Sequence, residues 1–271
     1  MAFLGYIGSK NRIAKHIISH LSATRKQCLV DVFGGSAAIT ILSEFPKRVY
    51  NDVNGDLVNL FRVMADDDMR YRLLRKLKWT PMSREVFERN YKEFFLPGDN
   101  SFRLIENEID RAHATFYRMK FCFAGNYFDG GFAVSPNNRG NIKELYSYQN
   151  TLRTFSKIGR IFKNTLIEHM DFQKIISLYG NKDDCVLFVD PPYFSKNYYV
   201  HSMTAVHHEF LASALLDCKA PVVCTFYDCK ELRDLYGEDC WRYETVKASK
   251  NFNPKSKNKT TRTQETILIK K

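Results

Sequence analysis

Val186-Leu187-Phe188-Val189, followed directly by Asp190-Pro191-Pro192-Tyr193, is the stretch of sequence that decides the fold. The apolar run predicts a buried strand, and the four residues after it would lie where open α/β sheets bind ligands. The two prolines donate no backbone N–H and hold the chain extended, which makes the segment a rigid shelf with free carbonyls. We infer that Asp190 and the Pro191 carbonyl accept the two hydrogens of a planar aromatic amine, while Tyr193 stacks on its ring.

A strand, a glycine turn and a helix are predicted near the amino terminus. Residues 28–33 read as a buried strand that runs into Gly34-Gly35-Ser36, where backbone N–H groups can approach a ligand closely. The next strand ends at Asp52, which lies 21 residues after Asp31, close to the spacing of about 20 expected for a ribose-binding acid. The turn lacks the full G-x-G-x-x-G pattern, so we expect an adenosine-type ligand rather than a dinucleotide.

In motif order and content, the chain resembles the D12 class, or Dam-like group, of DNA adenine-N6 methyltransferases. That family begins with an aromatic-x-G-[GS]-K segment, here Tyr6-Ile7-Gly8-Ser9-Lys10. It continues with D-x-F-x-G-S, N-D-x-N, D-[FY] and D-P-P-Y segments and a closing E-x-[LI]-x-I strand, all of which occur here in that order. The resemblance implies transfer of a methyl group from S-adenosylmethionine to the N6 amine of an adenine flipped out of duplex DNA, without a metal.

The same resemblance implies two sets of site residues. The catalytic set is Asp190, Pro191, Pro192 and Tyr193. The residues that would surround S-adenosylmethionine are Tyr6, Lys10, Asp31, Phe33, Gly34, Gly35, Ser36, Asp52, Asp171 and Phe172.

The predicted fold class is α/β: a Rossmann-like, seven-stranded S-adenosylmethionine-dependent methyltransferase core with an inserted, mostly helical target-recognition domain. The core is assigned to residues 1–56 and 152–271, and the DNA-binding insertion to residues 57–151. Apolar residues recur at helical spacing from Leu57 to Met64 and again from Ile105 to Phe123. A basic cluster in the first part of the insertion either follows the DNA backbone or is a solvated helix face; it comprises Arg70, Arg72, Arg75, Lys76 and Lys78.

The net charge of +11 indicates an anionic partner, which we take to be double-stranded DNA. Residues 245–271 hold eight lysines or arginines against the single acid Glu265, which predicts a carboxyl-terminal arm that contacts phosphates. The candidate DNA-binding residues are Arg118, Lys120, Asn126, Arg139, Lys255, Lys257 and Lys259.

The insertion departs from the pattern of relatives that read GATC. They carry F-N-G, then R-Y-N, then G-x-F-N-V-P. This chain has Phe123-Ala124-Gly125 and later Gly131-Phe132-Ala133-Val134-Ser135-Pro136, with no arginine between Gly125 and Arg139. Because a bidentate arginine is the commonest reader of guanine, the sequence argues against a GATC target.

Composition narrows the remaining choices. Seven scattered cysteines without a C-x-x-C pair indicate free thiols in a reducing compartment. The chain shows no membrane-length apolar stretch or secretory leader, so we expect it in the cytoplasm of a bacterial, archaeal or phage-infected host. We further expect a monomer or weak dimer. His207 and His208 favour a surface cluster at a helix start over a metal site. A cytosine-N4 methyltransferase, an RNA substrate and a catalytically silent DNA-binding relative remain open alternatives.

Overall fold

A seven-stranded sheet, formed within the residues described by the computed structural model, carries the fold. The structure describes residues 3–5, 8–94, 102, 104–123, 130–135, 142–194, 203–248 and 263–271. The strand order is β3-β2-β1-β4-β5-β7-β6; β1 to β5 are parallel, β7 runs antiparallel to β5, and β6 and β7 pair antiparallel. The strands are β1 (Cys28–Asp31), β2 (Lys47–Asn51), β3 (Thr165–Glu168), β4 (Cys185–Val189), β5 (Val222–Phe226), β6 (Trp241–Ala248) and β7 (Thr263–Lys270).

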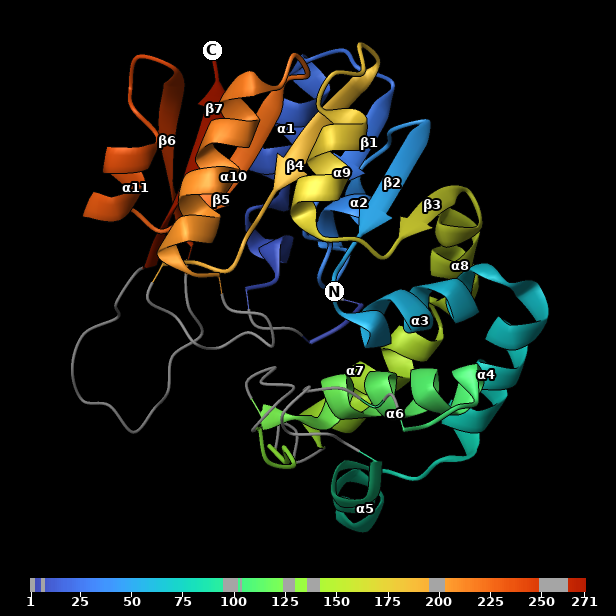
Figure 1. Cartoon of the computed structure of the whole chain (residues 1–271). Coiled ribbons are helices and arrows are strands. Elements are labelled where there is room, and N and C mark those ends of the chain that lie inside the picture. Colours follow the sequence, from blue (N-terminus) through green and yellow to red (C-terminus); the bar gives the residue numbers. More distant parts are fainter. Residues whose placement is uncertain are drawn as a thin grey trace, which may run out of the picture.

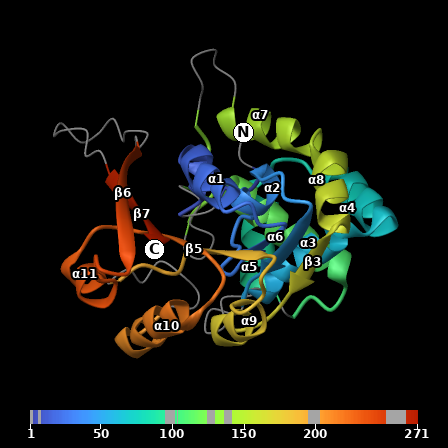
Figure 2. The same cartoon turned by 90° about the horizontal axis from the view of Figure 1, so that it is seen from above.

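Helices cover both faces of this sheet. The helices α1 (Ala14–Ala23) and α2 (Ala38–Leu42) lie on one side, and α9 (Phe172–Tyr179) and α10 (Ala205–Asp217) lie on the other, as Figure 2 shows. The short helix α11 (Lys230–Leu235) precedes β6. Every residue of β1, β4 and β5 is buried, which is the burial expected of parallel strands enclosed on both faces and the reason for their continuous apolar sequences.

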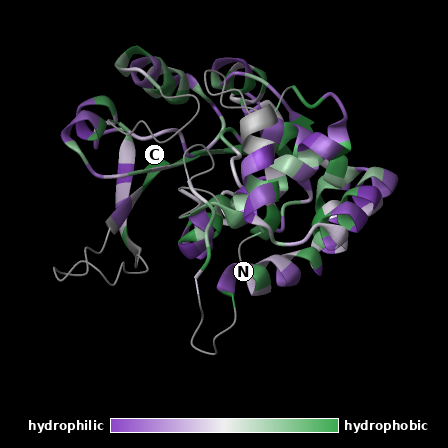
Figure 3. Ribbon diagram, turned by 90° about the horizontal axis from the view of Figure 1, so that it is seen from below, coloured by the Kyte–Doolittle hydropathy of each residue, from purple (hydrophilic) through white to green (hydrophobic). Residues whose placement is uncertain are grey.

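The chain between β2 and β3 forms a helical body beside the carboxyl ends of the strands (Figure 1). Asn54, Asp66 and Asn107 accept backbone N–H groups at the starts of three of its helices and so define where these begin. Hydrophilic and hydrophobic residues alternate along these helices in Figure 3, as expected of amphipathic helices. They are α3 (Gly55–Ala65), α4 (Asp67–Trp79), α5 (Arg84–Phe94), α6 (Glu108–Phe121), α7 (Lys143–Leu152) and α8 (Phe155–Lys163).

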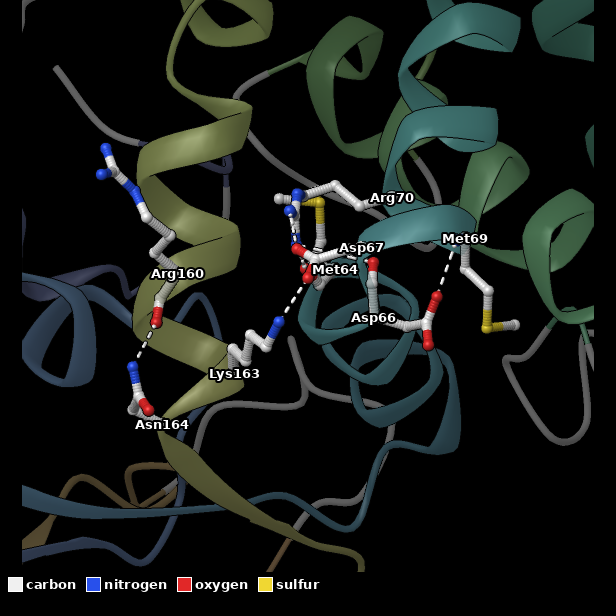
Figure 4. A network of polar contacts seen from close by, with 8 residues as sticks. All are labelled: Met64, Asp66, Asp67, Met69, Arg70, Arg160, Lys163 and Asn164. Atoms are coloured by element: carbon white, nitrogen blue, oxygen red, sulfur yellow. Dashed lines mark hydrogen bonds and ion pairs between the residues drawn. The ribbon is translucent and has the colours of Figure 1, made fainter.

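The helical body extends beyond residue 151, where the sequence predicts that the insertion ends. Phe61 of α3 stacks on Phe162 of α8 with ring centroids 4.2 Å apart, and one apolar cluster includes residues of every helix from α3 to α8. Figure 4 shows a polar contact between α4 and α8: Asp67, at the start of α4, forms ion pairs with both Arg70 and Lys163. The side chain of Arg70, which belongs to the predicted basic cluster, is therefore only 13% exposed and makes contacts within the helical body.

Candidate cofactor and catalytic site

The carboxyl ends of β1, β2, β4 and β5 meet at one edge of the sheet, and a pocket of about 470 Å³ opens there. This volume lies within the range of roughly 300–1,000 Å³ that small-molecule and cofactor sites occupy. Most of the residues predicted to form the site line it. They are Lys10, Asp31, Phe33, Gly34, Gly35, Ser36, Asp52, Asp171, Phe172, Asp190 and Pro192, whereas Tyr6 lies outside the described residues.

The glycine turn after β1 is shaped by close packing against β2. A Cβ on Gly34 would lie 2.2 Å from the Tyr50 ring, so no larger residue fits without displacement, and the Gly34 N–H donates to the Asn51 carbonyl at 2.7 Å. Gly35 has a φ of 49° and donates its N–H to Asp52 Oδ2 at 2.7 Å. Asp52, the predicted ribose-binding acid, therefore also holds the turn in place.

Asp31 places a buried acid at the floor of the pocket. Its side chain is 1% exposed, and Oδ2 accepts the Thr40 hydroxyl at 2.7 Å. Its other oxygen, Oδ1, has no hydrogen-bond partner among the described residues. Burial raises the pKa of Asp31 to about 7, and the nearby Asp190 and Asp52 add to the shift. An unsatisfied buried carboxylate of this kind fits a cationic group on a ligand, such as an amino group.

Aromatic rings form one wall of the pocket. Phe33 and Phe172 are stacked with ring centroids 5.6 Å apart, and Asp171 caps α9 by accepting the Gln173 N–H. Asn51 joins this wall to the sheet, because its amide donates to Val32 and Met170 carbonyls and accepts the Met170 N–H. The two predicted aromatic and acidic positions after β3 are thus brought to the same pocket as the glycine turn.

The shelf after β4 holds Asp190 by both oxygens. Oδ1 accepts the hydroxyls of Thr225 at 2.7 Å and Tyr193 at 3.2 Å, and Oδ2 lies 2.9 Å from the Lys10 ammonium. A carboxylate held at this many points is orientated before any substrate arrives. Its remaining lone pairs are the ones that a target amine would use.

Tyr193 and Pro191 belong to the same segment but are not among the residues that line the pocket. The Tyr193 side chain is 6% exposed, and its ring meets Tyr227 edge-on at a centroid distance of 4.5 Å. Pro191 is buried as well. Stacking of Tyr193 on a target base consequently stays a prediction.

Three residues at the site were given no role from the sequence. Thr225 holds Asp190, Glu265 lies 3.6 Å from Lys10, and His207 lines the pocket. The signal for Thr225 was present, because it is a polar residue inside the apolar run Val222–Phe226. His208 is 1% exposed, so the predicted surface location of the histidine pair is wrong for that residue.

The predicted DNA-binding residues fall into two groups. Arg118 is 4% exposed with its guanidinium 4.7 Å from the centre of the Phe87 ring, and Lys120 donates to the Phe3 carbonyl and the Thr151 hydroxyl. Burial lowers the pKa of Lys120 to about 8. Both side chains make internal contacts in this structure, and their assignment to DNA contact stays a prediction. Asn126, Arg139, Lys255, Lys257 and Lys259 lie outside the described residues.

Other kinds of site are not seen in the described part of the chain. No helix there is both long and apolar enough to span a membrane. The same residues include no group of three or more histidine, cysteine or acidic side chains suited to a metal ion.

Fold and site together define the class: a Rossmann-like α/β protein with a glycine turn after β1, an acid after β2 and an acidic Pro-Pro-aromatic segment after β4. The chain belongs to the D12 class of N6 adenine-specific DNA methyltransferases, whose family model matches residues 6–252.

Individual relatives agree with that family. A DNA adenine methylase of Vibrio cholerae is 27% identical over 71% of this chain, and the matched segment spans 65% of that relative's length. The retron Ec67 DNA adenine methylase of Escherichia coli is 26% identical over 91% of this chain and 84% of its own length. The DNA N-6-adenine-methyltransferase of Escherichia phage P1 is 25% identical over 92% of this chain but only 33% of its own length.

Proposed function

We propose that this protein transfers the methyl group of S-adenosylmethionine to the exocyclic N6 amine of a specific adenine in duplex DNA. The observation that carries the proposal is the pocket in which the glycine turn, Asp31 and Asp52 are brought together with the Asp190 shelf. Membership of the D12 class supports adenine as the base and DNA as the substrate. The relatives' names support the same reaction.

The cofactor side of the pocket suits S-adenosylmethionine. Oδ1 of Asp31 has no hydrogen-bond partner among the described residues and could accept the amino group of the cofactor. Asp52 faces the same pocket and could hold the ribose hydroxyls. Phe33 and Phe172 offer an apolar surface for the adenine. When bound, the cofactor supplies a methyl group already activated by a positively charged sulfur. The chain's own task is to place the acceptor nitrogen in line with that methyl group.

Asp190 is the residue that prepares the acceptor. An adenine inside a duplex cannot reach the pocket, so it must be flipped out at a cost of a few kcal/mol. Asp190 and the Pro191 carbonyl then accept the two hydrogens of N6. This frees the nitrogen lone pair from the ring and stabilises the positive charge that develops on N6.

The test is replacement of Asp190 by alanine. Methyl transfer to N6 of adenine, measured by nucleoside analysis of DNA, should fall below detection, while the dissociation constant for S-adenosylmethionine should stay close to that of the wild type. Asp184→Ala is the matched control, since this exposed carboxylate precedes the opposite end of β4 and should leave activity unchanged. An Asp190→Ala variant that keeps activity within ~10-fold of wild type, less than ~1.4 kcal/mol of transition-state stabilisation, would exclude the assigned role.

A further inference from the structure

Two carboxylates, Asp190 and Glu265, share the buried ammonium of Lys10. Lys10 is 3% exposed and lies 2.9 Å from Asp190 and 3.6 Å from Glu265. Glu265 is on β7, one residue before the Phe226–Thr266 pairing, so it reaches the same edge of the sheet from an antiparallel strand. Its side chain is 14% exposed, and Oε2 has no hydrogen-bond partner within the described part of the chain.

The cluster carries one negative charge too many when all three groups are ionised. A buried cluster with such an excess readily takes up a proton, because protonation relieves the repulsion between like charges. Burial raises the pKa of Glu265 and Asp190 adds to the shift, although Lys10 opposes it. Burial alone would lower the pKa of Lys10, but Asp190 and Glu265 outweigh it and the pKa is raised.

Two tyrosines are the other titratable groups that face Glu265 within the described residues. Tyr193 and Tyr227 stand on the shelf side, and burial raises the pKa of Tyr227. The residue opposite Glu265 on β6 is Val246, which has no titratable group. Glu265 is the carboxylate of this cluster that does not line the pocket.

The proposed reaction must dispose of one proton. The N6 lone pair forms a bond to the methyl carbon while the electrons of the carbon–sulfur bond stay on sulfur, which becomes a neutral thioether. N6 is left with a positive charge and three bonds to hydrogen or methyl besides its bond to the ring. It becomes neutral only when one of its two hydrogens leaves as a proton, and Asp190, the proposed hydrogen-bond acceptor of N6, is in position to take it.

We propose that Lys10 and Glu265 carry this proton away from Asp190. The inference rests on the proposed function. Asp190 takes the proton from N6, and Lys10 accepts it from Asp190 Oδ2 while giving one of its own to Glu265 across the 3.6 Å between Nζ and Oε2. Glu265 then releases the proton to solvent through its partly exposed side chain. Asp190 and Lys10 end in the ionisation states in which they began, ready for another turnover. Glu265 touches neither adenine nor cofactor and acts through Lys10.

The first experiment compares Glu265→Gln with Glu244→Gln in single-turnover methylation across pH. Glu244 lies on the same hairpin but pairs with His20 outside the pocket, so its variant should behave as wild type. Glu265→Gln should slow transfer at neutral pH by ~10-fold or more. It should also abolish the rise in rate that accompanies ionisation of Glu265, whereas Glu265→Asp should retain this rise. A slower Glu265→Gln with an unchanged pH profile, or one as fast as Glu244→Gln, would overturn the proposal.

A second experiment needs no DNA and so separates this inference from the proposed function. The Glu265 carboxyl is titrated by NMR in the wild type and in Asp190→Asn, with Glu265→Gln identifying its signal. Removing the Asp190 charge leaves Lys10 to Glu265 alone, so the Glu265 midpoint should fall. Identical midpoints would refute the coupling even if DNA is methylated. A lower midpoint in a protein that methylates no DNA would instead reject the proposed function and keep the cluster.

Discussion

Thr225 shows how one hydroxyl can control the reacting carboxylate. Its hydroxyl donates to Asp190 Oδ1 at 2.7 Å from a fully buried position on β5. Thr225→Val keeps the shape but removes a hydrogen bond to a charged group, which is worth about 1.5–3 kcal/mol. We expect kcat to fall ~10- to 100-fold with little change in the affinity for S-adenosylmethionine.

Thr40→Val provides the reciprocal control. Thr40 donates to Asp31 in the same way, but Asp31 lies on the cofactor side of the pocket. This variant should weaken cofactor binding by calorimetry and leave the chemical step of the bound enzyme nearly unchanged. If both variants affected the same parameter, the division of the pocket into two sides would be wrong.

Asp31 predicts a pH dependence of cofactor binding. Its pKa of about 7 in the free protein means that the carboxyl is mostly protonated well below this value and mostly ionised well above it. Because the amino group of S-adenosylmethionine gains an ionic partner only when Asp31 is ionised, affinity should rise across this window, by at most ~10-fold per pH unit. Calorimetry at several pH values should show this rise in the wild type and a flat response in Asp31→Asn.

The same residue predicts a stability effect of opposite sign. The folded-state pKa of Asp31 is raised above the unfolded value of 3.8. Protonated Asp31 therefore stabilises the fold fully below pH 3.8, and this stabilisation is lost as the pH rises to about 7. Above the folded-state pKa, Asp31→Asn should therefore melt at a higher temperature than wild type, and in mild acid the difference should be smaller. If the melting temperature of Asp31→Asn did not exceed that of wild type above this pKa, Asp31 would not carry a buried charge there.

The site acids were predictable from sequence where a strand signal or a spacing placed them. Asp190 could be placed in this way, Asp52 was placed by its spacing of 21 residues from Asp31, and the structure brings both to one pocket. The contact from Thr225 to Asp190 crosses between two strands, and the one from Lys10 to Glu265 joins the two ends of the chain. No local pattern encodes such contacts, because they depend on which strands become neighbours.

At the scale of an element, the turn between β1 and α2 leaves no room for a side chain at Gly34. Gly34→Ala would place a methyl group 2.2 Å from the Tyr50 ring. Overpacking of this kind costs about 1–3 kcal/mol, and we expect a lower melting temperature together with weaker cofactor binding, because the turn lines the pocket. Gly237→Ala is the control, since an added Cβ there meets nothing within 4 Å.

The strands were easier to predict than the extent of the helical body. Continuous apolar runs indicated β1 and β4 because both faces of these strands are covered. Where the insertion ends was harder to predict: α8 is strongly amphipathic and packs on α3, although it follows the residue at which we expected the core to resume. Amphipathicity shows that a helix has a buried face but not which neighbour covers it.

At the scale of the whole molecule, the excess positive charge predicts how DNA is held. The lysines at 255, 257 and 259 lie outside the described residues, and we propose them as phosphate contacts on the basis of the sequence charge alone. Their joint replacement by glutamine should weaken binding equally for target and unrelated duplexes. It should also flatten the plot of log affinity against log salt by up to about 0.9 for each phosphate that is no longer neutralised.

The control for that prediction removes the same charge elsewhere. Lys26, Lys182 and Lys219 precede β1, β4 and β5, at the edge of the sheet opposite the pocket. Replacing these three should leave the salt slope as it is. A changed set of methylated sequences with an unchanged slope in the arm variant would mean that the arm reads bases.

The helical body is joined to the sheet through two neighbouring parallel strands, since it leaves after β2 and returns into β3, where Arg48 pairs with Thr165. Because the body is attached at two adjacent points, its length and surface can vary while the strand ends that carry the pocket acids keep their positions. We propose that this body reads the target sequence; a new target would then require changes in this one segment and none in the pocket.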